Sequence, residues 1–372
     1  MDRLDSKITL NDPFGNFDPQ IFSFCTEVKI ESSYDNLTDT ADFIIPKKLR
    51  YVRPDGSEVD SIVRGENPLF KLGDKAKIEV GYNSKLATCF VGFISGIRQK
   101  FPLRFKLEDE VYKLKQTSIT LSLNNPSLAD LLGEILPTGI VYEITAEQNL
   151  GKFRITDATP AEVLDELRKK HGIFSFFRDS ILYVGLSIVS ELQKVHRFEF
   201  QTPQIINGDG LTYISASERK IKVICKSIAS DNTKLEATAG DANGEVRTLY
   251  FNNYTLQALQ DTADRMVDEL KYSGYDGAFT TFATPLVNHG DVVELINPLI
   301  PEQSGGYLVP KVVTRFGWGI GGRQDISIKQ KIYDLDTDGK QIPVSETTEE
   351  AKKTAKRLFD AWLGLRQAQT TN

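Results

Sequence analysis

Segments in which apolar and polar residues alternate recur in both halves of this chain, and they restrict its fold more than any other feature. Alternation with a period of two is typical of β-strands with one buried face, because successive side chains point to opposite faces of a sheet. Short strands without intervening helices predict sandwich or barrel domains. We therefore expect an α+β, mainly β chain. The pattern covers residues 22–30, 41–45, 76–82, 88–97, 219–228, 291–296, 307–316 and 325–333.

The pattern changes near residue 116 and predicts helices. Asn125 is positioned to cap one helix, with Pro126 as its first residue. A second helix begins at the capping box Thr159-Pro160-Ala161-Glu162, in which the threonine accepts from a free amide and the glutamate reaches back. Gly172 is placed to end this helix. Residues 116–192 are therefore expected to form a small inserted α+β domain.

Two β regions flank this insertion. Residues 1–115 are expected to form a first antiparallel β-barrel domain, and residues 193–335 are expected to form a similar second one. The second contains a helical insertion near residues 254–272, where apolar side chains recur on one helical face. The segment Asp241-Ala242-Asn243-Gly244 is a candidate hairpin turn.

One short motif occurs in both β regions. Leu72-Gly73-Asp74 opens an alternating segment, and His289-Gly290-Asp291 opens another. A returning strand follows a loop in each case. Internal duplication of one barrel explains this parallel, and chance similarity of a short motif remains the other explanation.

Residues 336–372 are expected to form a linker and a C-terminal amphipathic helix. Lysines and an arginine oppose its apolar stripe. Because a helix with exposed aromatic residues needs a surface to cover them, this stripe is our candidate interface. Docking on the same chain and docking on a neighbouring subunit both remain open. The interface residues are Leu358, Phe359, Trp362 and Leu365.

Composition excludes several classes of protein. The chain has 372 residues and a net charge of −6, which argues against a protein that grips nucleic acid through its phosphates. The N-terminus lacks the apolar core of a signal peptide, and no apolar run reaches the ~18 residues of a membrane helix. The three cysteines, Cys25, Cys89 and Cys225, are far apart and are expected to be small buried apolar residues in a reducing compartment.

The candidate chemical motifs all have a structural explanation. Residues 317–322 satisfy G-x-G-x-x-G, but a strand pattern follows them, so a glycine-rich hairpin loop is expected. Residues 334–339 match the start of a calcium loop whose twelfth position is Ser345, which predicts a solvated turn. The carboxylates of Glu108, Asp109 and Glu110 are expected on an exposed strand face. We therefore assign no catalytic, cofactor-binding or metal-binding residue, and expect a protein that is not an enzyme.

Four groups of motifs, in this order along the chain, resemble the phage baseplate hub family, the late-control-D proteins related to the hub portion of VgrG. They cover the Gly-Asp strand with its Phe-x-Gly return strand, the end of the first barrel, the inserted domain, and the closing hairpin of the second barrel. Together they span about residues 20–335. The motifs are Leu72-Gly73-Asp74 with Phe90-Val91-Gly92-Phe93-Ile94, residues 105–116, residues 159–164 with 177–185, and residues 306–328.

The resemblance implies a virion structural protein, assembled in the host cytoplasm, that forms a homotrimeric hub. Two barrels per chain would give a pseudo-hexameric ring that adapts the sixfold tail tube to the threefold spike. The implied partners are other copies of the chain, the tail tube or distal tail protein, the spike, and further the tape measure protein and the baseplate wedge. DNA would pass through the channel without specific binding, and an acidic lumen would favour that passage. The alternative function is a hydrolase or binding protein of a phage tail that acts on cell-wall or surface glycans.

Overall fold

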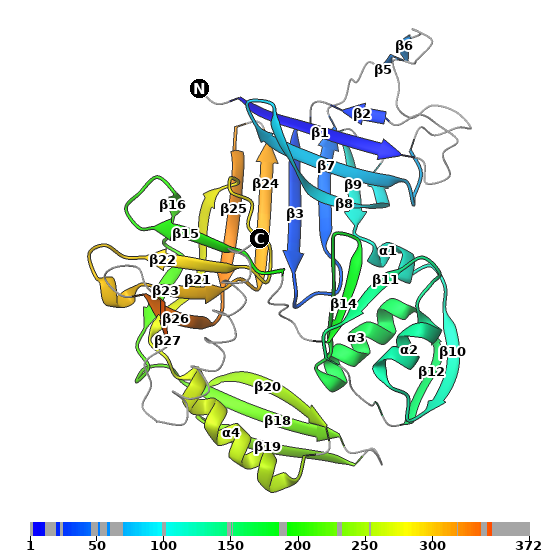
Figure 1. Ribbon diagram of the computed structural model, residues 1–372. Helices are drawn as coiled ribbons and strands as arrows, with labels where there is room; N and C mark the ends of the chain where they lie inside the picture. The colour runs from blue at the N-terminus through cyan, green and yellow to red at the C-terminus, as the bar shows by residue number, and fades with distance from the viewer. Residues whose placement is uncertain are drawn as a thin grey trace, which may run out of the picture.

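The structure is a computed structural model. It describes residues 3–11, 20–22, 25–45, 51–52, 58–59, 70–98, 102–146, 150, 152–185, 192–228, 233–252, 254–317, 319–335 and 341–343. The chain is mainly β, as predicted, and its largest element is a 12-stranded sheet (Figure 1). In spatial order this sheet contains β16 (Ile205–Asn207), β21 (Gly274–Phe282), β25 (Gly321–Ile328), β24 (Lys311–Gly317), β3 (Glu27–Ser33), β4 (Thr40–Ile45), β9 (Leu103–Glu108), β8 (Lys85–Arg98), β7 (Lys75–Tyr82), β1 (Leu4–Asn11) and β2 (Gln20–Phe22), with β17 (Leu211–Ile214) also paired to β21.

In the first half of the chain, the large sheet folds over on itself and encloses a hydrophobic core. β8 pairs with β7 through residues 85–93 and with β9 through residues 93–98, and its register shifts next to Ser95. The two layers enclose a cluster that includes Ile8, Ile78, Phe43 and Phe105, each fully buried. Phe43 and Phe105 stack at 4.6 Å between ring centroids. A small pair, β5 (Tyr51–Val52) and β6 (Glu58–Val59), completes this half.

The second half covers its part of the large sheet with a separate layer. A five-stranded sheet crosses β24 and β25 in Figure 1 and encloses a core with Phe198, Phe279 and Tyr307. A short 3₁₀ helix (Pro301–Gln303) precedes one of its strands. The sheet contains, in order, β15 (Val195–Glu199), β22 (Val292–Ile296), β23 (Gly305–Leu308), β26 (Lys331–Leu335) and β27 (Gln341–Pro343).

The two predicted β-barrel domains are not confirmed, because the described strands form no closed barrel. The large sheet is an open path that ends at β16 and β17 on one side and at β2 on the other. The segments 307–316 and 325–333, each expected as one strand, are two strands each. Pro310 lies between β23 and β24, and since proline cannot donate to a ladder, the chain changes sheet there.

The segment predicted as an inserted domain, residues 116–192, packs around a core of its own, to which Val111 and Leu114 before it also contribute. The helices α1 to α3 all contribute to this core, and the buried side chains of α2 and α3 face one cluster. Residues 174–185 form a hairpin whose turn residues, Asp179 and Ser180, have φ of 50° and 65°. The elements are α1 (Val111–Leu114), β10 (Ile119–Asn124), α2 (Leu128–Ile135), β11 (Val141–Ile144), β12 (Lys152–Ala158), α3 (Pro160–His171), β13 (Phe174–Arg178) and β14 (Ile181–Gly185).

One helix cap in this domain was predicted correctly and one was not. Thr159 and Glu162 form the predicted capping box of α3, and Gly172 ends that helix in a left-handed conformation. Asn125 does not cap α2. Ser127 does, and its hydroxyl accepts from the backbone N–H of Asp130 while the Asp130 carboxylate accepts from the N–H of Ser127.

A second small layer interrupts the second half. The predicted helix is α4 (Leu256–Leu270), and it packs on β18 (Ile221–Ile228), β19 (Lys234–Gly240) and β20 (Glu245–Asn252). β18, β19 and β20 form a sheet that is separate from the layers of the second half. The strand predicted at 219–228 therefore does not belong to a barrel. Asp241–Gly244 is not a hairpin turn, because β18 lies between β19 and β20 and the connection crosses its end.

Candidate functional site

The two Gly-Asp motifs form the same turn. In each, the aspartate Oδ2 accepts a bond of 2.9 Å from the backbone N–H three residues earlier, Lys71 for Asp74 and Asn288 for Asp291. Both aspartates are buried, with 6% and 1% of their surface exposed. The carboxylate therefore closes the turn internally in both halves of the chain.

The backbone around the two turns also matches. Gly73 and Gly290 have φ of +89° and +81°, which a residue with a Cβ rarely adopts. The N–H of Gly73 donates to the carbonyl of Ile94 at 2.8 Å, and the N–H of Gly290 donates to that of Val309 at 2.7 Å. The N–H groups of Ile94 and Val309 return bonds to Asp74 and Asp291, at 2.9 and 3.0 Å. With the carboxylate bond, three hydrogen bonds thus recur in both turns, and they place Ile94 in register with Val309.

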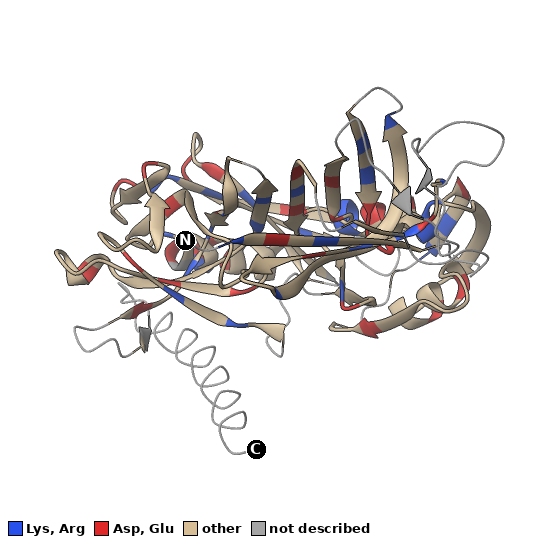
Figure 2. Ribbon diagram, turned by 90° about the horizontal axis from the view of Figure 1, so that it is seen from above, with Lys and Arg blue, Asp and Glu red and all other residues tan. Residues whose placement is uncertain are grey.

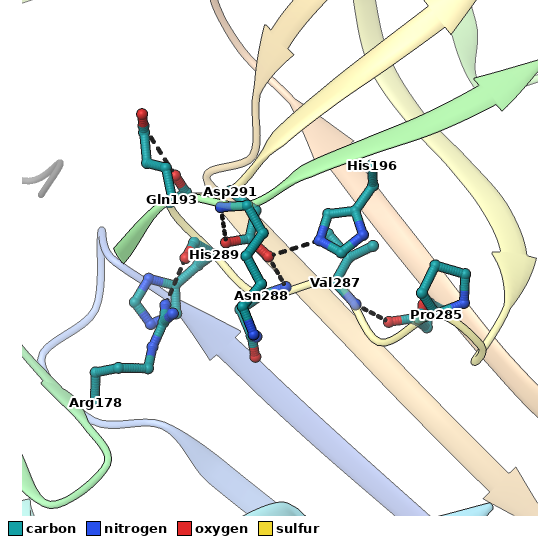
Figure 3. Close-up of polar contacts among 11 residues, drawn as sticks. Arg178, Gln193, His196, Pro285, Val287, Asn288, His289 and Asp291 are labelled. Carbon is teal, nitrogen blue, oxygen red and sulfur yellow. Dashed lines mark hydrogen bonds and ion pairs between the residues drawn. The ribbon is translucent and has the colours of Figure 1, made fainter. Parts of the chain in front are cut away.

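The second turn is held by additional polar contacts, which Figure 3 shows. Asp291 Oδ1 accepts from the backbone N–H of Lys194 at 3.2 Å, and its Oδ2 lies 3.0 Å from His196 Nε2. Gln193 Nε2 donates to the carbonyl of Gly290 at 3.1 Å. The segment that enters β15 is therefore tied to the start of β22.

His289 lies where three parts of the chain meet. Its imidazole is 2% exposed and packs edge-on against Phe176 of β13 and against Tyr34, which follows β3. Burial lowers the pKa of His289 to about 3, and the positive charge of Arg178 acts in the same direction. Histidine is therefore neutral here and serves as an aromatic packing group.

Two buried carboxyl groups adjoin this junction, contrary to the prediction of an exposed face at residues 108–110. Asp109 and Glu110 are each 6% exposed, because β9 ends at Glu108 and the chain turns inward to begin α1. Asp109 accepts from the N–H of Val111 at 3.1 Å and from that of Asp39 at 3.2 Å. Asp39 Oδ2 in turn lies 3.8 Å from His289 Nε2.

Asp39 is half-buried and Asp109 is buried, and the pKa of each carboxyl group is shifted. Burial raises the pKa of Asp39 to about 6, although bonds from Ser32 and Ser33 favour its charged form. The pKa of Asp109 is raised well above its usual value by burial and then by the charge of Asp39. The junction therefore holds two carboxyl groups whose pKa values are both raised.

Among the described residues, no side chain covers the first turn as His289 is covered in the second. Leu72 precedes Gly73 as His289 precedes Gly290, but Leu72 is 61% exposed whereas His289 is 2% exposed. In the described part of the chain, the neighbour of Gly73 is Tyr112, whose hydroxyl would lie 3.4 Å from an added Cβ. An apolar side chain is thus left open at the turn that the first half provides.

The sheet also contains a strand edge that the two halves use differently. β24 pairs with β3 over residues 311–317, which joins the second half of the chain to the first. In the register given by the matched turns, residues 96–98 of β8 correspond to 311–313 of β24. The edge of residues 96–98 that faces away from β9 pairs with no described strand. The outer edge of β17 also pairs with no described strand.

The remaining predicted site residues are distributed as follows. The interface residues Leu358, Phe359, Trp362 and Leu365 lie outside the described residues, as does most of the calcium-like segment 334–339. The G-x-G-x-x-G segment joins β24 to β25 in an antiparallel hairpin, as predicted. Cys25 and Cys225 are buried, and Cys89 is half-buried.

Searches for metal and membrane features in the described ranges are negative. No group of three or more histidine, cysteine, aspartate or glutamate side chains is arranged to hold a metal ion there. No described helix has the length and apolar character needed to cross a bilayer.

Solved structures share this architecture. A tail protein from Neisseria meningitidis MC58 superposes with a TM-score of 0.57 at 15% identity, covering 87% of this chain and 96% of its own. The 43 kDa tail protein of prophage MuSo2 from Shewanella oneidensis gives 0.54 at 15% identity, covering 88% and 98%. This chain has the fold of phage tail proteins.

The phage tail fold extends beyond phages in these comparisons. The E. coli c3393 protein, a type VI secretion component described as similar to the T4 tail proteins gp27 and gp5, gives a TM-score of 0.50 at 11% identity and covers 86% of this chain and 76% of its own. No family model and no curated protein matches the sequence. Of the site residues, sequence reasoning found the Gly-Asp turns, but it did not predict that Asp39, Arg178 and His289 meet, because they come from distant segments.

Proposed function

We propose that this chain is a structural, non-enzymatic hub of a phage tail baseplate or related injection particle. The single observation that carries the proposal is the doubled Gly-Asp turn, since Asp74 and Asp291 close equivalent turns with the same carboxylate bond and the same two backbone bonds. A chain that presents one kind of β surface twice can mimic two subunits of a sixfold tube. The fold shared with tail proteins supports the same conclusion.

Three copies would then form a ring of six similar units around a channel. Within one chain, the second unit binds the first through β24 and β3. The next contact around the ring would use the corresponding edges that no described strand covers, β8 of one copy and β17 of its neighbour. Edge strands with unpaired backbone groups are ready to pair with another chain.

The register of this contact follows from the repeat. Val313 faces Glu31 in the β24–β3 ladder. Arg98 corresponds to Val313 through the matched turns. Thr212 corresponds to Glu31 through the strands with which they pair. Thr212 pairs with Asp276 on β21, and Glu31 pairs with Thr40 at the equivalent place on β4. We therefore expect Arg98 of one copy to lie opposite Thr212 of the next.

The further partners follow from this role. One side of the ring would bind the tail tube or distal tail protein, and the threefold side would bind the spike, with contacts to the tape measure protein and the baseplate wedge. The stripe of Leu358, Phe359, Trp362 and Leu365 is proposed to bury itself on a neighbouring subunit. Such permanent interfaces exceed the ~1,200–2,000 Å² of a standard contact. The protein would act in the virion tail after assembly in the host cytoplasm.

A double variant, Arg98→Cys with Thr212→Cys, tests the ring directly. The two positions lie in different halves of one chain, so a disulfide between them should link copies and give a covalent trimer that reducing agent dissolves. Each single variant is the matched control and should stay unlinked. A chain that has the mass of a monomer at high concentration, and that forms no disulfide-linked species, would overturn the proposal.

A further inference from the structure

The polar face of the 12-stranded sheet carries its charges in rows. Strand pairing aligns Arg323, Arg315, Lys29, Asp42 and Lys106 across β25, β24, β3, β4 and β9. We call the four cations the cationic row, and Asp42 interrupts it. Figure 2 shows basic and acidic positions alternating along several strands.

A second row of opposite sign runs beside the first. Two residues further along the same strands, pairing aligns Asp325, Val313, Glu31, Thr40 and Glu108. Its three carboxylates form what we call the acidic row. Residues two apart on a strand are about 7 Å apart, so the two rows lie within one Debye length at physiological salt.

Ion pairs connect the two rows. Arg315 pairs with Asp325, and Lys29 pairs with Glu31. Lys311, on the far side of the acidic row, lies 3.3 Å from Glu31 Oε2. At the other end, Lys115 lies 2.6 Å from Glu108 Oε2. Each carboxylate of the acidic row therefore engages at least one cation.

These contacts determine how strongly this face can bind a polyanion. A lysine or arginine strengthens DNA binding by neutralising a phosphate and releasing its counterions, which a cation already held by a carboxylate does poorly. The two rows contain four cations and, with Asp42, four carboxylates, and Lys311 and Lys115 beside them add two further cations. The chain's net charge of −6 therefore does not reside on this face.

We propose that this face is a charge-compensated surface over which double-stranded DNA passes without being retained. That it lines a channel rests on the proposed hub function, whereas the rows themselves are a property of the single chain. The acidic row acts by occupying cations that would otherwise hold phosphates.

Fluorescence anisotropy with a labelled DNA duplex of about 30 base pairs at low salt tests this on the full chain. The wild-type chain should bind weakly. Glu31→Gln with Asp325→Asn should bind at least tenfold more tightly, because it frees Arg315, Lys29 and Lys311. The logarithm of its affinity should fall with the logarithm of salt concentration with a slope of about −2 to −3.

The matched control is Glu134→Gln with Glu143→Gln, which removes two exposed carboxylates from the inserted domain and gives the same net charge. It should bind as weakly as the wild type. A second variant, Lys29→Glu with Glu31→Lys, exchanges one pair, keeps the balance, and should also bind weakly. Equal binding by the two carboxylate-deficient variants, or tight binding by the wild type, would overturn the proposal. Because monomer and trimer both expose the face to free DNA, a failed ring would not alter this measurement.

Discussion

Arg178 Nη2 donates a hydrogen bond of 2.7 Å to the backbone carbonyl of His289, and this contact joins the inserted domain to the second Gly-Asp turn. The arginine ends β13, and the histidine precedes β22. Tyr34 and Asp39, from the connection between β3 and β4, complete the junction. These contacts therefore help to fix the position of the inserted domain against both halves of the chain.

Replacing this arginine should loosen the junction. Arg178→Ala removes the charged donor and leaves the His289 carbonyl with one partner fewer, so the free energy of unfolding should fall by about 1.5–3 kcal/mol. Urea denaturation followed by near-UV circular dichroism measures this change. The exposed Arg154 on β12 is a matched control, since Arg154→Ala should change stability by less than about 0.5 kcal/mol. Equal effects of both substitutions would contradict the role assigned to Arg178.

The half-buried carboxyl at Asp39 predicts a pH dependence of stability. Its folded pKa, raised to about 6, exceeds the ordinary value of 3.8, so between these values the folded state binds more protons than the unfolded state. The contribution of Asp39 to stability is therefore greatest at low pH and declines as the pH rises from about 4 to 6. Asp39→Asn removes this decline. Its stability relative to the wild type should increase by about 1–3 kcal/mol between pH 4 and pH 7. A difference that stays constant over that range would contradict the shift.

Glycine at the second Gly-Asp turn is required by its backbone conformation. Gly290 has φ of +81°, and an added Cβ would meet no atom within 4 Å, so the cost of Gly290→Ala is conformational. It should lower the free energy of unfolding by about 1–2 kcal/mol. Gly133 on α2 also has open space around it but lies within a helix. Gly133→Ala should instead stabilise the chain by about 0.5–1 kcal/mol. The two substitutions should therefore change the free energy of unfolding in opposite directions, which thermal unfolding measures. Opposite signs would show that the backbone conformation, and not steric crowding of the added methyl group, sets the effect.

The exposed leucine at the first turn predicts an assembly defect. Leu72 occupies the position that His289 has in the second turn, where neighbouring elements cover it, so a neighbouring copy should cover Leu72 in the ring. Leu72→Asp should therefore weaken trimer formation at least tenfold and leave the thermal midpoint of the monomer within about 2 °C. Val141 is equally exposed, at 60% against 61%, and Val141→Asp is the matched control. Sedimentation velocity measures both, and an unchanged trimer with Leu72→Asp would contradict this assignment.

Local features of the fold could be predicted wherever the signal lay within a few residues. The capping box at Thr159, the stripe of α4 and the strand alternation of β4 and β7 all depend on neighbours in sequence, and each was predicted correctly. The strand predicted over residues 22–30 is instead divided between β2 and β3. Helix α2 shows the limit of such reasoning. Asn125 and Ser127 are both good caps, and the reciprocal bond from Asp130 selects Ser127.

Strand order could not be predicted because it depends on contacts between distant segments. Nothing near Asp241–Gly244 indicates that β18 inserts between the strands on either side, and nothing near Val309-Pro310 indicates that the chain moves from one sheet to another. The buried position of Asp109 has the same origin. Its partners, Asp39 and the start of α1, become neighbours only when β4 pairs with β9.

The sequence by itself determined that this chain is mainly β, where its long helices lie, and that a Gly-Asp turn occurs twice, because periodicity, capping and the demand for positive φ are local properties. The tertiary structure decided that the two turns share one hydrogen-bond pattern, that charges align in rows across five strands, and that Arg178 meets His289. Those relationships join residues up to hundreds of positions apart, and only the pairing of strands brings them together.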